Sequence, residues 1–161
     1  MDGKTQGLAP WQVGETDPGL PGVLQLIRES FAYMESRIDP PSSMHRLTVA
    51  DLSRAAREGE IWAIGPAPDA CVILTPKPDA LYLGKLAVSA QARGQGLARR
   101  LVEHAAIRAR ARGLPALELQ TRVELVENHA TFARLGFVET GRTAHAGYDR
   151  PTSITMRRPL D

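Results

Sequence analysis

The sequence predicts one domain of the α/β class, and three observations lead to that prediction. The 161 residues are about one domain's worth of chain, with no internal repeat, low-complexity tract or interdomain linker. Apolar residues recur at helical spacing in some segments, whereas other segments are short apolar runs bounded by turn residues. The third observation is a strand, a glycine-bearing loop and a long helix in direct succession over residues 83–101.

The N-terminal part predicts a short strand and two helices. Residues 11–13 are a candidate strand, which Gly14 and the following Asp-Pro-Gly turn would end. Over residues 20–34 apolar side chains recur every three or four positions, which is typical of an amphipathic helix. After a loop with two prolines, residues 48–51 have the pattern of a capping box, and the helix that they open should stop near Gly59.

The middle of the chain predicts an antiparallel meander and then a long helix. Apolar runs at residues 61–64 and 71–75 are joined by a turn rich in Gly and Pro, and a second turn leads into a strand over residues 80–88. The helix begins near Leu97 and closes at Gly113, with Leu, Val and Ala residues on one face. We expect the arginines opposite that face to be solvated, namely Arg100, Arg108, Arg110 and Arg112.

The C-terminal part predicts three further strands around one short helix. A strand over residues 116–121 follows the long helix, and a short helix spans about residues 130–135. A strand starts at Phe137, and a closing strand over residues 153–156 ends the domain.

The loop between the third strand of the meander and the long helix has the properties of a phosphate site. Backbone N–H groups stay unpaired at the positive end of a helix, where an anion can accept their hydrogen bonds. A Cβ atom at Gly94 or Gly96 would hold a bulky anion away from those groups. The dinucleotide fingerprint fails because Arg99 takes its third glycine position, and no Gly-Lys-Ser/Thr follows as a P-loop requires. For a bare Gly-x-Gly, an ordinary tight turn is the alternative.

Two segments of the chain carry a resemblance to a known family. Residues 91–96, Gln-Ala-Arg-Gly-Gln-Gly, match the signature Gln/Arg-x-x-Gly-x-Gly/Ala. Here the sequence resembles the GNAT superfamily of acyl-CoA-dependent N-acyltransferases, in which this segment binds the pyrophosphate of the cofactor. Residues 127–137 are similar to a later motif of the family, a short helix that runs into Gly-Phe and a strand. The two motifs stand in the family's order and together cover about residues 81–138.

The resemblance implies a fold, an activity and a set of cofactor contacts. The fold is a single GNAT-like N-acetyltransferase domain over residues 1–161, with a mixed and mainly antiparallel sheet flanked by helices. The activity is transfer of an acetyl group from acetyl-CoA, the co-substrate, to a primary amine. In the family, the strand before the loop holds the pantetheine arm, and the loop after the first helix often helps line the acceptor site. The cofactor contacts implied for this chain are Leu86, Ala87, Val88, Arg93, Gly94, Gln95, Gly96, Leu97, Ala98, Asn128 and Phe132.

The catalytic residues need separate argument, because the sequence departs from the family at Phe132. Many members have a tyrosine here that protonates the leaving thiolate, and phenylalanine cannot donate a proton. Water or another residue would then supply the proton; Tyr148 is the candidate, with packing of its loop as the alternative. Glu118 is the candidate base, and its side chain points either into the cleft or to solvent. Since no activated nucleophile is visible, we predict direct attack in a ternary complex.

Composition argues against several other classes of protein. Apolar residues make up 43%, charged residues 24% and the net charge is +2, as in ordinary globular proteins. Aromatic residues make up only 5% and no nucleic-acid-binding module is present, so nucleic acid is not an expected partner. No apolar segment is long enough to span a bilayer and the first residues lack a signal-peptide pattern, so we expect a cytoplasmic protein without a membrane partner.

Cysteine and histidine usage points away from thiol and metal chemistry. The single cysteine, Cys71, lies in an apolar run and is expected to be a core residue in a reducing compartment. The histidines show no metal-ligand spacing, so no metal is expected; they are His45, His104, His129 and His145.

The role of the domain and the identity of the acceptor have alternatives at this stage. A non-catalytic acyl-CoA-binding or sensing module is favoured by Phe132 and by the lack of a carboxylate on the strand before the loop. The acceptor is a small-molecule or peptide amine, and the residues do not separate metabolites, antibiotics, polyamines, peptide N-termini and protein lysines. Pairing of exposed strand edges in a homodimer is likewise left open.

Overall fold

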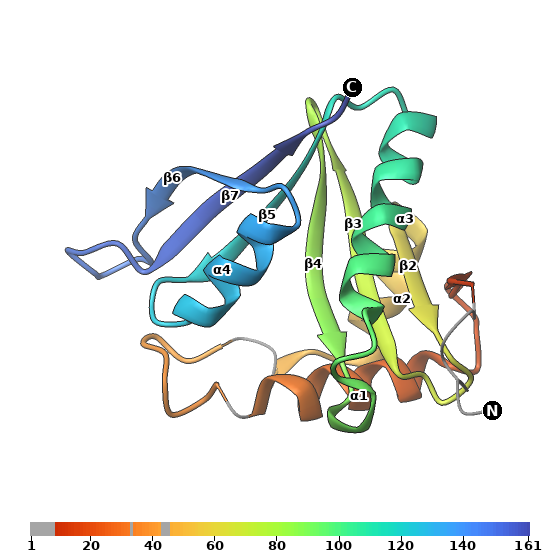
Figure 1. Cartoon of the computed structure of the whole chain (residues 1–161). Coiled ribbons are helices and arrows are strands. Elements are labelled where there is room, and N and C mark those ends of the chain that lie inside the picture. Colours follow the sequence, from red (N-terminus) through yellow and green to blue (C-terminus); the bar gives the residue numbers. More distant parts are fainter. Residues whose placement is uncertain (1–8, 33, 43–45) are drawn as a thin grey trace.

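The computed structural model describes residues 9–32, 34–42 and 46–161, which form one mixed sheet with helices on both faces (Figure 1). The seven strands lie in the order β1-β2-β3-β4-β5-β7-β6. They are β1 (Trp11–Gln12), β2 (Glu60–Ile64), β3 (Ala70–Lys77), β4 (Ala80–Val88), β5 (Ala116–Arg122), β6 (Val138–Thr143) and β7 (Ser153–Pro159). The helices are α1 (Leu20–Ala32), α2 (Val49–Glu58), the short 3-10 helix η2 (Ala90–Ala92), α3 (Leu97–Ala111) and α4 (Val126–Arg134). The predicted fold class is confirmed.

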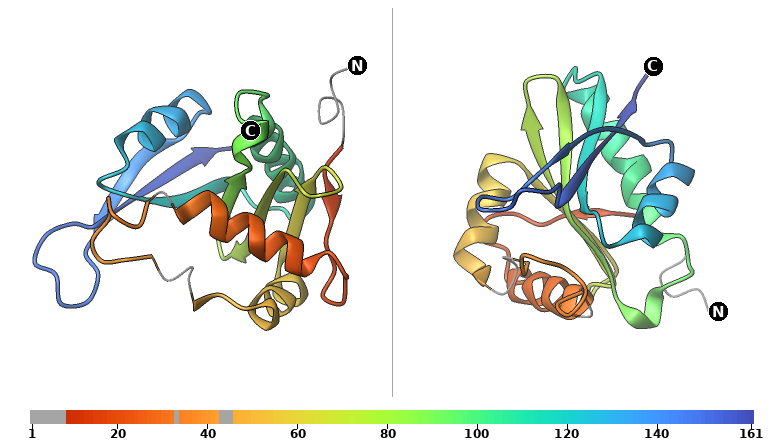
Figure 2. Two further views of the ribbon diagram at one scale, coloured as in Figure 1. Left: turned by 90° about the horizontal axis from the view of Figure 1, so that it is seen from below. Right: turned by 90° about the vertical axis from the view of Figure 1, so that its left-hand side faces the viewer.

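The helices form two layers, which Figure 2 shows on opposite sides of the sheet. Alternation along each strand decides which layer receives a side chain. On β2, Ile61 and Ala63 pack in the apolar cluster beneath α1 and α2, whereas Trp62 packs in the cluster beneath α3. No helix among the described ranges is long and apolar enough to cross a membrane.

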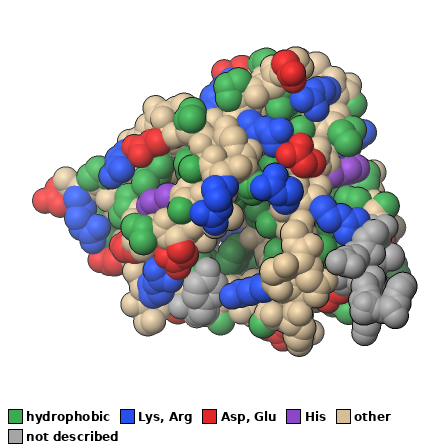
Figure 3. Space-filling model, in the orientation of Figure 1, with side chains coloured by type: hydrophobic (Ala, Val, Ile, Leu, Met, Phe, Trp, Pro, Cys, Tyr) green, Lys and Arg blue, Asp and Glu red, His purple; other side chains and the backbone are tan. Residues whose placement is uncertain are grey.

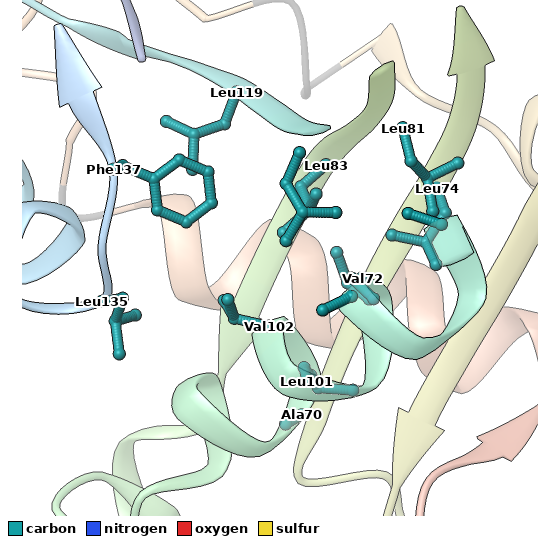
Figure 4. Packing of buried hydrophobic residues seen from close by; sticks show 14 of the residues in the cluster. Ala70, Val72, Leu74, Leu81, Leu83, Leu101, Val102, Leu119, Leu135 and Phe137 are labelled. Carbon is teal, nitrogen blue, oxygen red and sulfur yellow. The ribbon is translucent and has the colours of Figure 1, made fainter. Parts of the chain in front are cut away.

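The larger core lies between α3 and the centre of the sheet (Figure 4). Leu101 and Val102 of α3 are fully buried and belong to one cluster with Val72 of β3 and Leu83 of β4. Burying a side chain of this size stabilises the fold by about 1.5–3 kcal/mol relative to leaving it in water. The apolar face predicted for this helix is therefore confirmed, and it holds the loop before α3 against the sheet.

The predicted ends of α2 and α3 are confirmed by their caps. Thr48 and Asp51 form a capping box, in which the Asp51 N–H donates to Thr48 Oγ1 at 3.1 Å and the Thr48 N–H donates to Asp51 Oδ2 at 3.0 Å. At the end of α3, Gly113 has a φ of +72° and its N–H donates to the Arg110 carbonyl. The Leu114 N–H donates to the Ala109 carbonyl, so both bonds of a Schellman motif are present.

The expectation that the arginines opposite the apolar face of α3 are solvated holds only in part for Arg108 and Arg112, whose side chains are 32% and 35% exposed but form ion pairs. Both donate to Glu60 at the start of β2, each through Nε at 2.8 Å, and the Glu60 side chain is only 3% exposed. Trp62 Nε1 donates to the same carboxylate at 2.7 Å. The two arginines lie about fifty positions from Glu60 in the chain, so no helical periodicity could reveal their pairing with it.

The parallel strands β4 and β5 are neighbours at one end only. The paired positions are Leu81 with Leu117 and Tyr82 with Glu118. Beyond them β4 runs on to Val88 and β5 to Arg122 without further pairing, and Figure 1 shows the two strands spreading apart. The sheet therefore opens at the carboxyl ends of two central strands, directly before the loop that leads into α3.

A bulge in β4 lies at the start of this opening. The register between β3 and β4 shifts between Cys71 and Ile73, where two residues of β4 stand opposite one residue of β3. Lys85, one of these two residues, has a φ of +53°, which is uncommon for a residue with a side chain. A bulge bends its strand and increases the local twist, which is consistent with β4 leaving β5 here.

Candidate functional site

The loop between β4 and α3 presents unpaired backbone groups at a helix N-terminus. Gly94 and Gly96 have φ values of +83° and +76°, a region that glycine adopts without strain. Gly96 is also the N-cap of α3, and no side chain caps this helix. The first N–H groups of α3 therefore lack both an intrahelical acceptor and a side-chain cap, and together with the helix dipole they attract an anion.

The space beside the two glycines is open. A Cβ atom built on Gly94 or Gly96 would meet no protein atom within 4 Å. Crowding inside the protein therefore does not require glycine here; the positive φ does, and the open space lets a bulky anion reach the backbone amides. These residues fit the pyrophosphate that the resemblance implies.

A cavity of about 490 Å³, here called the loop cavity, lies against this loop. Ten of the eleven cofactor contacts implied by the resemblance line it, and Gln95 is the exception. The structure thus brings together residues from the end of β4, the loop, the start of α3 and α4. Its lining residues are Ser30, Phe31, Leu86, Ala87, Val88, Ala92, Arg93, Gly94, Gly96, Leu97, Ala98, Glu127, Asn128, Thr131 and Phe132.

A second cavity of about 290 Å³, the inner cavity, lies between the diverging strands β4 and β5. Four residues line both cavities, namely Phe31, Leu86, Asn128 and Phe132. The two spaces therefore meet, and a long ligand bound at the loop can extend between the strands. Figure 3 shows this face of the molecule hollowed near its middle, with Lys and Arg side chains around the hollow. The other lining residues are Met34, Ser42, Tyr82, Leu83, Gly84, Lys85, Leu119, Gln120, Thr121, Arg122 and Leu125.

The charged groups of the inner cavity are both cationic. Lys85 comes from the bulge of β4 and Arg122 from the end of β5. Burial, and then the charge of Arg122, lower the pKa of Lys85. Tyr82 also lines this cavity, and burial followed by the charge of Glu118 raises its pKa, which keeps the phenol neutral.

The segment after α1 closes the inner cavity on one side, and we call residues 37–41 the strap. Arg37 pairs with Glu127 of α4, and its hydrogen bonds lower the pKa of that carboxyl to about 2. Arg122 Nη1 donates to the Pro40 carbonyl at 2.6 Å, which ties the strap to β5. Met34 and Ser42, which flank the strap, line the cavity. This location agrees with the role that the resemblance implies for the loop after the first helix.

Tyr148, the candidate acid, contacts the strap from the loop between β6 and β7. Its hydroxyl donates to Asp39 Oδ1 at 2.5 Å, and this hydrogen bond raises the pKa of Tyr148. Arg150 pairs with the same carboxylate at 3.4 Å. Tyr148 is not among the residues that line either cavity.

Glu118, the candidate base, lies where β4 and β5 are still paired. Its carboxylate forms ion pairs with Lys77 at 3.6 Å and with Arg157 at 3.5 Å, and the Glu118 side chain is 20% exposed. Glu118 lines neither cavity. It is paired with Tyr82 on the neighbouring strand β4, and Tyr82 lines the inner cavity. The structure therefore separates Glu118 from Tyr148 and connects Glu118 to the inner cavity through Tyr82.

Phe132 lies where the two cavities meet. Its ring packs edge-on against Phe137, with the ring centroids 6.0 Å apart. The position at which many family members place the acid therefore faces the site in this protein too, but with an apolar ring.

None of the described cysteine and histidine residues lines either cavity. Cys71 is completely buried, and burial raises the pKa of its thiol to about 12. His104 packs against Trp62 with the ring centroids 4.1 Å apart, and His129 Nε2 lies 2.9 Å from the Arg122 carbonyl. Within the described ranges no group of His, Cys, Asp and Glu could hold a metal ion, and His45 lies outside those ranges.

Among the residues that line the inner cavity, sequence reasoning named only Leu86, Asn128 and Phe132 as site residues; the polar residues that it missed include Tyr82, Thr121 and Arg122. Alternation along β4 could have identified Tyr82. It lies between Leu81 and Leu83, which face α3, so its own side chain faces the opposite side of the sheet. For Thr121 and Arg122 the decisive feature is the divergence of β5 from β4, which is visible only in three dimensions.

Comparison with known proteins decides the family of this chain. The family model described as the acetyltransferase (GNAT) family matches residues 23–137, which is more than two thirds of the chain. The chain belongs to the GNAT family of acetyltransferases. The predicted resemblance is thereby confirmed, and the matched residues include both motifs that carried it.

Individual relatives of this GNAT protein agree with the family and the fold. An IAA acetyltransferase of Azospirillum brasilense is 29% identical over 155 residues, which cover 92% of this chain and 97% of that protein. The acetyltransferase structure from Streptococcus agalactiae superimposes with a TM-score of 0.74 at 19% identity, covering 96% of this chain and 99% of the other. The ribosomal-protein-S18-alanine N-acetyltransferase of Escherichia coli superimposes with a TM-score of 0.67 at 23% identity, covering 94% and 92%.

Proposed function

We propose that this protein transfers an acetyl group from acetyl-CoA to a primary amine by direct attack in a ternary complex. The observation that carries the proposal is the continuous space that leads from the helix N-terminus at Gly96 to the inner cavity. Family membership supports the acetyltransferase activity. Acetyl-CoA would supply an activated acyl group, a thioester that a correctly placed neutral amine can attack.

The chain's own residues have distinct tasks in this proposal. The amides of residues 94–98 hold the pyrophosphate, and the last residues of β4 hold the pantetheine arm where β5 has turned away. Phe31, Leu86 and Phe132 surround the junction of the two cavities and exclude water from it. Such a channel would orient the two reactants, and correct orientation lowers the barrier to their reaction.

The proton transfers are assigned to Glu118 and Tyr148 as candidates. Since Glu118 does not line the cavity, we propose that it receives the ammonium proton through water or the Tyr82 hydroxyl. The Tyr148 hydroxyl already donates a hydrogen bond to Asp39. Tyr148 would therefore have to protonate the thiolate indirectly, through the strap or through water.

Binding of acetyl-CoA tests the proposal first. Calorimetric titration of the intact protein should show one site, and Gly94→Glu should weaken binding at least about a hundredfold because a carboxylate would occupy the anion site. Gly113→Glu is the matched control, since Gly113 has a similar φ of +72° and equally open surroundings at the other end of α3. No binding by the intact protein, or equal loss in both variants, would contradict the assignment of this loop.

A sensing module is the second candidate, and two observations favour it. Phe132 cannot act as an acid, and Glu118 is already engaged by Lys77 and Arg157. Thiol release from acetyl-CoA over a panel of amines separates the two functions. Tight binding without thiol release from any amine would favour the sensor.

A further inference from the structure

The inner cavity holds two cations that have no anionic partner among the described residues. Lys85 and Arg122 line it from opposite sides, since one belongs to β4 and the other to β5. None of the described residues that line the cavity is Asp or Glu, and neither cation takes part in an ion pair within the described ranges. Glu124, two residues beyond Arg122, accepts the Asp39 N–H through Oε2 and does not line the cavity.

Arg122 is held in place by neutral groups. Its Nη1 donates to the Pro40 carbonyl at 2.6 Å and its Nη2 donates to the Pro41 carbonyl at 3.4 Å. Carbonyl oxygens orient the guanidinium without balancing its charge, and two of its five N–H groups are used. Further donors and a full positive charge remain for a ligand.

The effect of the two cations on each other points to a missing anion. Burial and the charge of Arg122 both disfavour the charged form of Lys85. An anion between the two side chains would favour that charged form and replace their repulsion with two charge-assisted hydrogen bonds.

Thr121 provides a second, independent observation. It lines the inner cavity next to Arg122, is 8% exposed, and its Oγ1 has no hydrogen-bond partner among the described residues. Buried hydroxyl groups in folded proteins almost always have a partner. An oxygen of a ligand in this cavity would supply one.

We propose that the acceptor is a small primary amine that also carries a carboxylate, bound by Lys85 and Arg122 with a third hydrogen bond from Thr121. This inference rests on the proposed function, because it treats the inner cavity as the acceptor site. Neither cation lines the loop cavity, so the phosphates of the cofactor do not account for them. The volume of about 290 Å³ suits a molecule the size of an amino acid, and Phe31, Met34 and Leu125 would contact its apolar part. Polyamines are disfavoured, since they would bring further positive charge to this cavity.

The first test compares acceptors in matched sets of three. The sets are L-leucine, L-leucinamide and 3-methylbutylamine; glycine, glycinamide and methylamine; and 4-aminobutanoate, 4-aminobutanamide and propylamine. Rates of thiol release are compared at equal concentrations of the neutral amine. In at least one set we expect kcat/KM for the carboxylate to exceed both analogues by about tenfold or more, as a charged hydrogen bond would produce. Equal values throughout all three sets would overturn the inference.

The second test asks whether Lys85 and Thr121 cause the preference. Lys85→Met should raise KM for the preferred carboxylate about tenfold and leave its uncharged analogues within twofold, and Thr121→Val should act in the same direction. Arg54→Met is the control, since Arg54 is an exposed residue of α2 that pairs with Asp51. A uniform fall in kcat for all three forms would overturn the inference, because it would show that Lys85 acts on the transition state rather than on the carboxylate.

A binding measurement keeps this inference separate from the proposed function. Leucine, leucinamide and 3-methylbutylamine are titrated by calorimetry into protein saturated with CoA. Binding of the carboxylate alone, lost in Lys85→Met, supports the inference even if no amine releases thiol. Turnover of amines without carboxylate preference would leave the proposed function standing and overturn this inference. Neither turnover nor binding of any probe would overturn both.

Discussion

At the scale of single residues, the main feature of the site is that the residue at the junction of the two cavities cannot donate a proton. Phe132 stands at the junction of the two cavities, where a hydroxyl group would face the reacting atoms. The groups proposed for proton transfer lie one contact away instead, Glu118 behind Tyr82 and Tyr148 on the strap. In the proposed mechanism, proton transfer to and from the site would therefore pass through an intermediate such as water or Tyr82.

Substitution of the candidate acid and base tests this arrangement. We expect Glu118→Gln and Tyr148→Phe each to lower kcat about a hundredfold while leaving acetyl-CoA affinity unchanged, because each removes one proton-transfer group outside the cofactor site. Steady-state thiol release and calorimetry provide the two measurements. Glu139→Gln is the control, since Glu139 is an exposed residue of β6 that pairs with Arg142. Unchanged turnover in both test variants would remove these two residues from the mechanism and leave the fold assignment intact.

At the scale of elements, one buried carboxylate joins the start of β2 to the end of α3. Burial alone would raise the pKa of Glu60, but hydrogen bonds from Arg108, Trp62 and Arg112 outweigh it and lower the pKa to about 2. The ordinary pKa of a glutamate side chain is 4.5. Between about pH 2 and pH 4.5, Glu60 therefore binds a proton in the unfolded chain but not in the folded chain. Stability from this group is fully present above pH 4.5 and is lost as the pH falls towards 2.

Urea denaturation of Glu60→Gln across a pH series checks this link. At pH 7 we expect the free energy of unfolding to fall by about 3 kcal/mol, because two arginines lose their buried counter-charge. The difference from the unmodified protein should shrink below pH 4.5 and approach zero near pH 2. Glu103→Gln, which removes an exposed partner of Arg158, should cost less than about 1 kcal/mol. A constant difference between pH 7 and 3 would show that the carboxylate charge is not the cause.

At the scale of the whole molecule, the sheet consists of two parts that meet along a short seam. The part β1-β2-β3-β4 and the part β5-β7-β6 are paired at only two positions, and the strap reaches across the open side. A ligand in this opening would contact both parts and so stabilise the whole fold. Cys71, buried between the sheet and the helices α1 and α2, reports on that global stability.

Labelling of Cys71 by a disulfide reagent measures the coupling. We expect no labelling of the native protein on the timescale of a free thiol, because the sulfur is buried and its pKa is about 12. In moderate urea the labelling rate should follow global unfolding, and acetyl-CoA at a hundred times its Kd should slow it about a hundredfold. Cys71→Ala, which has no thiol, is the control for signal that does not come from labelling of Cys71. Rapid labelling in the absence of urea would show that this part of the core opens locally.

The sequence by itself determined the fold class and nearly every element, because those features depend on local pattern. The capping box at Thr48, the apolar face of α3 and the Gly94 and Gly96 loop are set by neighbours a few residues apart. The loop cavity, where we propose that the cofactor binds, was predictable for the same reason, since a strand, a loop and a helix N-terminus are consecutive in the chain.

Only the tertiary structure decided the inner cavity, where we propose that the acceptor binds. Lys85, Thr121 and Arg122 meet because β4 bulges and leaves β5 after two paired positions, and a strand's alternation does not say where its partner departs. The pairing of Glu60 with two arginines of α3 is likewise set by packing between distant segments. Arginines on the solvent side of a helix become ion-pair partners when the fold brings a buried carboxylate beneath them, and no local pattern contains that information.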